Sequence, residues 1–312
     1  SYEMELSQMN NDCAHQEYKS ILNRTRTEYV YNGKDIISSF ENIKNAEYIP
    51  KVCVIREEGS NGDKEMVSAL YQAGFQVHEL LTSDMIAAYQ SNDTNPLLKF
   101  NGIVFVGGFS YSDVFGAAKG WAGVILHNDY IKNWFNEFYQ DETKFSFGVC
   151  NGCQLMALLG WVPNTKIIQN NSERFESRFS RVKIFPSNSI MLQGLEDAIL
   201  GIWVAHGEGK IISTNTNMPI AYVDDNNNPT TQYPHNPNGS ENGSAAICSE
   251  NGKHLAIMPH PERCFKMWQW PYAKFSTEFN ANCTEEYSPW FLMFINLYKW
   301  SQDNRVKLDQ QN

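Results

Sequence analysis

A cysteine flanked by glycines is the first feature of this sequence that could carry chemistry. Cys150 follows the apolar run 145–149 and precedes a helix-like run that closes at Gly160, so we expect a strand to turn sharply into a helix at this residue. Gly148 and Gly152 relieve the crowding of such a turn. A thiol at the first turn of a helix faces unpaired N–H groups, which favours the nucleophilic thiolate. Taken alone, the pattern also fits a buried cysteine that merely follows a strand.

A histidine between two prolines supplies a candidate base. His260 stands in the run Met-Pro-His-Pro-Glu at 258–262, where the prolines stiffen the backbone and residues two apart project the same way. Glu262 can therefore accept a hydrogen bond from one ring nitrogen of His260 and orient the other. A structural ion pair in a turn would fit equally well. Together with Cys150, however, the pair completes a set of nucleophile, base and orienting carboxylate.

Two glycines after an apolar run offer donors for a substrate oxygen. Gly107 and Gly108 follow a strand-like segment and precede Phe109. The backbone N–H groups of Gly108 and Asn151, the residue after the cysteine, make a plausible oxyanion hole. A Gly-Gly pair is a weak signal by itself, because most such pairs are simply turns.

Two other interpretations use the same cysteine. Cys150 and Cys153 form a C-x-x-C motif at a helix start, which could be a dithiol redox centre or, with Cys264 and His260, a zinc site. The motif lies midway along a long chain rather than early in a compact fold, which argues against redox. There is only one C-x-x-C, which argues against zinc. The chain has seven scattered cysteines, and we expect most of them to be reduced core residues.

The elements that must position these residues alternate from residue 51 onward. Short apolar runs alternate with helical patterns, which predicts a parallel sheet with right-handed crossovers whose functional residues gather at the carboxyl ends of the strands. The second half carries strand-like runs separated by turns and predicts a more antiparallel lobe. Its Pro/Asn/Gly-rich stretch 224–243 predicts tight turns, and 288–300 predicts a closing helix. Residues 1–50 are polar and predict a linker or docking segment, so the domain is expected to span 51–312.

Composition excludes several classes of protein. The chain has 312 residues, of which 25 are basic and 35 acidic, giving a net charge of −10. It contains no block of Lys and Arg of the kind that binds phosphate backbones or anionic membranes, so neither nucleic acid nor a membrane is expected as a partner. No stretch approaches the ~20 apolar residues of a membrane span. We expect a globular, cytoplasmic protein, and we predict no metal site.

Taken together, these residues resemble the class I glutamine amidotransferases, Cys-His-Glu enzymes that release ammonia from the glutamine side chain. The resemblance implies a flavodoxin-like α/β fold, with a central, mostly parallel sheet flanked by helices and an additional antiparallel lobe. It covers about 51–300 and rests on these runs: FGVCNGCQLMALLG, SERFESRFSRV, WVAHGEGK, YPHNPNGS, MPHPER and MWQWPY.

The resemblance also implies roles for individual residues. Cys150 would attack the glutamine amide carbon, His260 would protonate the leaving ammonia and then activate water, and Glu262 would orient His260. Gly108 and Asn151 would supply the oxyanion donors.

Five further positions match the substrate pocket of the family: Gly107, Phe109, Gln154, Arg174 and Phe175. Glu173 departs from the glycine common in the family, which puts the local turn conformation in question. His206 matches a family motif without an assignable role.

Within the class, the runs resemble glutaminase domains of large single-chain synthetases of purine biosynthesis. That resemblance implies that glutamine is the substrate and that the ammonia serves ATP-dependent conversion of formylglycinamide ribonucleotide to its amidine. The partners would be the synthetase lobes of the same polypeptide, which would hold ATP and Mg²⁺, while this domain would need no cofactor. Because 1–21 resembles the chain before that domain, we expect the sequence to be a C-terminal piece. An amidotransferase with another acceptor, or a non-catalytic docking domain of the same fold, are the alternatives.

Overall fold

The computed structural model places most of the chain. It describes residues 3, 11–23, 28–33, 35–41, 48–91, 93–162, 164–214, 218–271, 273–283 and 285–311. Part of the predicted linker, 1–50, therefore lies outside the described residues.

Five parallel strands form one half of the sheet, as the alternating pattern predicts. They are β1 (Lys51–Arg56), β2 (Gln76–Leu81), β3 (Gly102–Phe105), β4 (Phe145–Val149) and β11 (His254–Ile257). Their order is β2-β1-β3-β4-β11, the doubly wound order in which the chain switches direction between β1 and β3. Every residue of β3, β4 and β11 is buried, because helices cover both faces of such a sheet.

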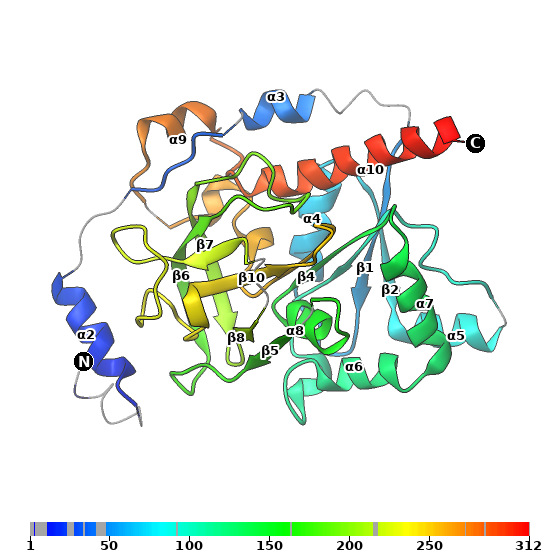
Figure 1. Cartoon of the computed structure of the whole chain (residues 1–312), viewed down its shortest axis with the longest axis horizontal. Coiled ribbons are helices and arrows are strands. Elements are labelled where there is room, and N and C mark those ends of the chain that lie inside the picture. Colours follow the sequence, from blue (N-terminus) through cyan, green and yellow to red (C-terminus); the bar gives the residue numbers. More distant parts are fainter. Residues whose placement is uncertain are drawn as a thin grey trace.

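Helices pack on both faces of the parallel half. They are α4 (Asp63–Gln72), α5 (Thr82–Gln90), α6 (Lys119–Leu126), α7 (Asp129–Gln140), α8 (Asn151–Leu158) and α10 (Phe291–Gln311). α4 packs on β1 and β2 and meets α10, whereas α8 packs on β3 and β4 and meets α6. Figure 1 shows α10 crossing the upper part of the molecule, below α3. Between β3 and β4 the chain forms the short 3-10 helix η1 (Ser110–Asp113) and then α6 and α7.

The antiparallel strands extend the same sheet. β10 (Ser244–Cys248), β9 (Ile220–Tyr222), β6 (Glu176–Ile184) and β7 (Ile199–His206) follow β11 in that order. The additional lobe is thus continuous with the parallel half, and the two-stranded sheet of β5 (Thr165–Ile168) and β8 (Lys210–Ser213) lies apart from it. The stretch 224–243 forms turns that end in η2 (Glu241–Gly243).

The last strand of the sheet returns to the centre of the molecule. Trp203 of β7 bridges to His260, which follows β11, although three strands separate β7 from β11 in the sheet order. The antiparallel half therefore curls back over the carboxyl end of β11. This curl places the end of β7 beside the predicted catalytic residues.

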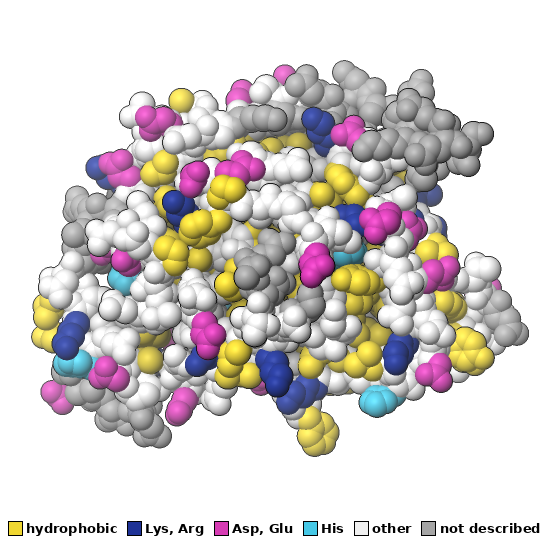
Figure 2. Space-filling view, viewed as in Figure 1, with side chains coloured by type: hydrophobic (Ala, Val, Ile, Leu, Met, Phe, Trp, Pro, Cys, Tyr) yellow, Lys and Arg dark blue, Asp and Glu magenta, His cyan; other side chains and the backbone are white. Residues whose placement is uncertain are grey.

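Segments before residue 51 pack on the domain. The helices α2 (Cys13–Asn23) and α3 (Ile36–Glu41) precede β1, and α9 (Thr277–Asn282) lies near the other end of the chain. The Tyr29 N–H donates to the Lys274 carbonyl oxygen, Val30 bridges to Ile199, and Tyr31 is fully buried. Within the described part of the chain, every helix is too short or too polar to span a bilayer. Figure 2 shows acidic and basic side chains interspersed over one face.

Candidate active site

Cys150 occupies a strained turn between β4 and α8. Its φ of 52° and ψ of −106° lie outside the backbone conformations that residues with a side chain usually adopt. Such strain costs about 1–3 kcal/mol and is found at functional sites. The backbone N–H of Cys150 donates to the Ile257 carbonyl oxygen at 2.9 Å, which fixes the turn to the end of β11. A Cβ on Gly152 would lie 2.1 Å from the Phe105 carbonyl oxygen, so the first turn of α8 requires glycine at this position.

His260 and Glu262 form a buried pair at the end of β11. His260 Nδ1 lies 2.6 Å from Glu262 Oε1, and both side chains are almost fully excluded from solvent. The His260 N–H donates to the Trp203 carbonyl oxygen at 2.8 Å, which holds the segment against β7. Burial lowers the pKa of His260, but the charge of Glu262 and the nearby Cys150 outweigh burial and raise it to about 9. The imidazole is therefore protonated at neutral pH.

The cysteine and the histidine meet over Gly107. A Cβ built on Gly107 would lie 2.9 Å from His260 Cε1 and 3.4 Å from Cys150 Cβ. Because Nδ1 of His260 is engaged by Glu262, Nε2 is the ring nitrogen left to exchange a proton on the side of Cys150. The thiol lies 3.5 Å from the Ala205 carbonyl oxygen of β7. The structure thus brings together all three residues of the predicted set.

The loop after β1 supports the predicted oxyanion segment. The N–H groups of Asn61 and Gly62 donate to the Gly107 carbonyl oxygen at 3.1 and 3.0 Å. Gly108 has a φ of +155°, and a Cβ there would lie 2.6 Å from Ser60 Cα. No larger residue fits without moving this loop. Sequence reasoning did not connect the loop with the site.

Asn151 and Gln154 connect three segments around the cysteine. The Asn151 Oδ1 accepts from the Ser110 N–H at 3.2 Å, and its Nδ2 donates to Gln154 Oε1 at 3.0 Å. The Gln154 Nε2 donates to the Glu208 carbonyl oxygen at 2.5 Å. Both side chains are buried. The Gln154 side chain therefore lies beside Asn151 and also fixes the turn after β7.

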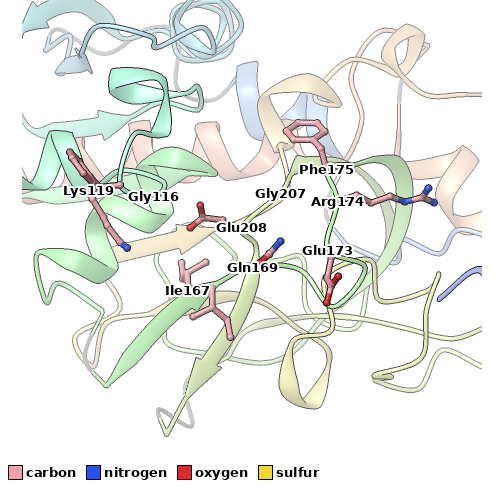
Figure 3. Close-up of a pocket in the computed structure, with 11 residues that line it drawn as sticks. Gly116, Lys119, Ile167, Gln169, Glu173, Arg174, Phe175, Gly207 and Glu208 are labelled. Carbon is pink, nitrogen blue, oxygen red and sulfur yellow. The ribbon is translucent and has the colours of Figure 1, made fainter. Parts of the chain in front are cut away.

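An open cavity of about 650 Å³ adjoins this turn. Residues of three segments line it: Phe115, Gly116, Lys119, Ile167, Ile168, Gln169, Glu173, Arg174, Phe175, Gly207 and Glu208. Figure 3 shows the Lys119 ammonium and the Glu208 carboxylate extending into the cavity. The Glu208 Oε1 also accepts from the Ala117 N–H at 3.3 Å. Sequence reasoning missed Lys119 and Glu208 as candidate binding groups, although Glu208 stands in the AHGEG run.

The predicted pocket residues Arg174 and Phe175 behave differently. The Arg174 side chain points away from the cavity in Figure 3 and lies 3.8 Å from Glu176. The Phe175 ring instead packs on Phe109, with ring centroids 6.0 Å apart. Glu173 has a φ of 58°, a left-handed conformation that glycine adopts without strain and that costs a side chain about 1–2 kcal/mol.

His206 is a buried structural neighbour of the base. Its Nε2 lies 3.2 Å from Asn238 Nδ2 in the predicted turn region, and a Cβ on Gly209 would overlap its ring. Burial and the charge of His260 lower the pKa of His206 to about 3. It is therefore neutral at physiological pH and joins the end of β7 to the turn at Asn238.

The two interpretations based on C-x-x-C receive no geometric support. Cys153 is fully buried, and burial raises its pKa well above that of a free thiol. The Cys264 thiol donates to the His260 backbone oxygen at 3.1 Å. In the described ranges, no group of three His, Cys, Asp or Glu side chains could hold a metal ion.

Comparisons with known proteins identify relatives of this chain. The chain is 44% identical over 319 residues to a phosphoribosylformylglycinamidine synthase of Dictyostelium discoideum, covering 95% of the chain and 23% of the relative. It is 42% identical to the protein of that name from Drosophila melanogaster, covering 96% of the chain and again 23% of the relative. The chain thus spans less than a quarter of these relatives.

The fold is also similar to a solved structure, that of PurLQS from Thermotoga maritima. The TM-score is 0.57 at 21% identity, covering 84% of this chain and 99% of that one. The family model of the CobB/CobQ-like glutamine amidotransferase domain matches residues 49–301. With its strained cysteine and buried His-Glu pair inside the matched region, the chain belongs to the glutamine amidotransferase domain family.

Proposed function

We propose that this chain is the glutaminase domain of a phosphoribosylformylglycinamidine synthase. It hydrolyses the glutamine side-chain amide and supplies ammonia to synthetase lobes of the same polypeptide. There, with ATP and Mg²⁺ bound to those lobes, formylglycinamide ribonucleotide is converted to formylglycinamidine ribonucleotide. The names of the relatives and their greater length support this assignment. The observation that carries the chemistry is Cys150 in a strained turn beside the buried pair of His260 and Glu262.

The first half of the reaction releases ammonia. The Cys150 thiolate attacks the amide carbon of glutamine, and the carbonyl oxygen becomes an oxyanion facing the N–H groups of Gly108 and Asn151. His260 is protonated at neutral pH because its pKa is raised, so it can give a proton to the departing nitrogen. The carbon–nitrogen bond breaks, ammonia leaves, and a γ-glutamyl thioester remains on Cys150.

The second half regenerates the enzyme. His260, now neutral, takes a proton from water, and the resulting hydroxide attacks the thioester carbon. The carbon–sulfur bond breaks, releasing glutamate and the Cys150 thiolate beside a protonated His260. Glu262 holds the ring through Nδ1 during both halves, so the same nitrogen acts as acid and then as base.

The cavity beside the turn after β7 suits the remainder of glutamine. Lys119 offers a cation for the α-carboxylate, and Glu208 offers an anion for the α-ammonium group. Phe109 and Phe175 provide an apolar wall at the oxyanion segment. In this proposal Arg174 contributes its backbone to the wall, since its side chain points outward.

Exposed apolar side chains near the cavity suit the proposed synthetase partner. Phe115 is 91% exposed, Val114 is 56% exposed, and Phe109 is 44% exposed. Such side chains cost free energy in water and favour burial against another protein surface. A lobe docked here would lie beside the site where ammonia forms.

A glutamine-analogue electrophile tests the nucleophile and its substrate together. We would incubate the purified chain with 6-diazo-5-oxo-norleucine and locate the added mass by peptide mass spectrometry. Labelling is expected at Cys150 alone, blocked by excess glutamine. Cys150→Ala should abolish labelling and lower glutamine hydrolysis by at least about 10⁴-fold. Cys153→Ala is the matched control and should keep the label.

Other outcomes would contradict the proposal in different ways. A Cys150–Cys153 disulfide without glutamine-protected labelling would favour the dithiol interpretation. Labelling that excess glutamine does not block would argue against a glutamine pocket. No labelling at Cys150, with the fold intact by circular dichroism, would favour a non-catalytic docking domain.

A further inference from the structure

A helix outside the matched family region contacts the wall of the proposed pocket. α2 (Cys13–Asn23) precedes residue 49, where the family match begins. Figure 1 shows it at the lower left edge of the molecule, and its Glu17 pairs with Arg178 of β6. The Tyr233 N–H donates to Gln16 Oε1 at 3.2 Å. Cys13, Ala14 and Tyr233 form a small buried cluster under the helix. The helix is therefore anchored next to the start of β6.

A network of charges continues from the helix into the sheet. Glu17 Oε1 lies 3.2 Å from Arg178 Nη1, and Glu17 Oε2 lies 3.3 Å from the Tyr233 hydroxyl. Arg178 Nη2 lies 2.6 Å from Glu176 Oε2, and the Glu176 side chain is 2% exposed. Because burying an unpaired carboxylate is costly, Arg178 must remain in place. Glu17 binds the outer side of the same guanidinium.

The network reaches the cavity through Arg174. Arg174 Nη2 lies 3.9 Å from Glu17 Oε2, and Arg174 Nε lies 3.8 Å from Glu176 Oε1. The Arg174 carbonyl oxygen accepts from Asn170 Nδ2 at 3.0 Å, and the same amide donates to the His206 carbonyl oxygen at 2.7 Å. The side chain is thus directed outward while the backbone is fixed to the segment after β7.

We infer that Glu17 is a positioning residue for the proposed glutamine pocket, contributed by a helix that precedes the amidotransferase domain. It holds Arg174 outward and thereby presents the next residue, Phe175, to Phe109 beside the oxyanion segment. Two arginines and two glutamates balance in the cluster of Arg174, Arg178, Glu17 and Glu176. Without the Glu17 charge the cluster carries one excess positive charge, and Arg174 can turn toward the acidic side chains in the cavity.

This inference rests on the proposed function, because the pocket is assigned to glutamine. Steady-state hydrolysis of glutamine by the full chain provides the first test. Glu17→Gln should raise KM for glutamine by about three- to five-fold, as expected for a partly exposed ion pair, with kcat unchanged. Glu17→Asp keeps the charge and should recover part of the loss. Glu28→Gln is the matched control, since Glu28 also precedes the domain and pairs with Lys274 at the surface.

Hydrogen exchange provides a second test that needs no activity. In Glu17→Gln the backbone amides of 173–178 should exchange faster than in the parent chain, while those of β3 and β4 should not change. Glu28→Gln should leave both regions unaltered. Unchanged KM together with unchanged exchange would overturn the inference. A parent chain that does not hydrolyse glutamine would instead contradict the proposed function, and the exchange result would then decide the positioning role alone.

Discussion

The reaction centre and the rim of the cavity are built in opposite ways. Cys150, His260 and Glu262 are between 0 and 6% exposed, and backbone hydrogen bonds to β11 and β7 fix Cys150 and His260. At the rim, the set of side chains that line the cavity, Phe175 is 47% and Phe115 is 91% exposed. These side chains come from separate segments of the chain. The chemistry is held by rigid backbone, whereas recognition depends on contacts that a single side chain can alter.

This difference predicts which changes affect turnover and which affect binding. A change at the reaction centre should lower kcat, because the groups there act on the transition state. A change at the rim should raise KM, because the contacts there hold substrate and transition state alike. A rim substitution that lowers kcat and leaves KM unchanged would contradict this division between turnover and binding.

After the loss of the Cys150 nucleophile itself, removing the charge of Glu262 should have the largest effect. Glu262→Gln keeps the shape of the side chain, but it removes the charge that raises the pKa of His260 to about 9. We expect kcat to fall by about 10²–10⁴-fold, the usual contribution of an oriented acid and base. Because the pKa of His260 falls without that charge, the alkaline limb of kcat/KM should move to lower pH.

The pH profile separates this effect from general damage to the fold. A partly unfolded enzyme would lose activity at every pH without moving the limb. Glu286→Gln is a suitable control, because Glu286 is exposed and pairs with Lys266 at the surface. An unchanged alkaline limb in Glu262→Gln would mean that His260 does not supply the proton.

Crowding the meeting point of the catalytic side chains should have the next largest effect. In Gly107→Ala the new Cβ would lie 2.9 Å from His260 Cε1, so the ring must shift. Misplacing a catalytic group by about 1 Å can cost 10²-fold in rate, and we expect kcat to fall by about 10- to 100-fold. Gly123→Ala, in α6, meets no atom within 4 Å and should leave kcat unchanged while stabilising the helix by about 0.5–1 kcal/mol. Equal effects of the two variants would contradict the geometry.

Much of the fold follows from local sequence patterns. The apolar runs that become β1, β3 and β4 predict buried parallel strands, and the structure confirms them. The apolar runs of the second half also predict strands. Whether these strands continue the parallel half depends on the pairing between β11 and β10. Pairing between strands is set by packing and not by the local run, so the sequence alone did not predict the curl that brings Trp203 to His260.

The candidate site shows the same difference between what local sequence predicts and what contacts between distant residues determine. Cys150 and the His-Glu pair stand in short motifs whose backbone geometry is local, so their types and spacing predicted where they meet. Arg174 matches a pocket position of the family, but the motif does not say whether its side chain or its backbone faces the pocket. The outward direction of the Arg174 side chain depends on Glu17 and Glu176, and Glu17 is far away in sequence. The division of the chain at residue 51 and the individual roles of the site residues stay predictions.

A rim substitution should give the smallest effect and the clearest division between KM and kcat. Lys119→Met keeps the length of the side chain but removes the cation that extends into the cavity (Figure 3). Since an exposed ion pair contributes up to about 1 kcal/mol, KM for glutamine should rise by at most about five-fold, and high salt should weaken the difference. Lys132→Met, on the exposed side of α7, removes the same charge away from the cavity and should not alter KM. If Lys119→Met lowered kcat while leaving KM unchanged, the cavity would take part in the chemistry, and rim and reaction centre could no longer be treated as separate regions.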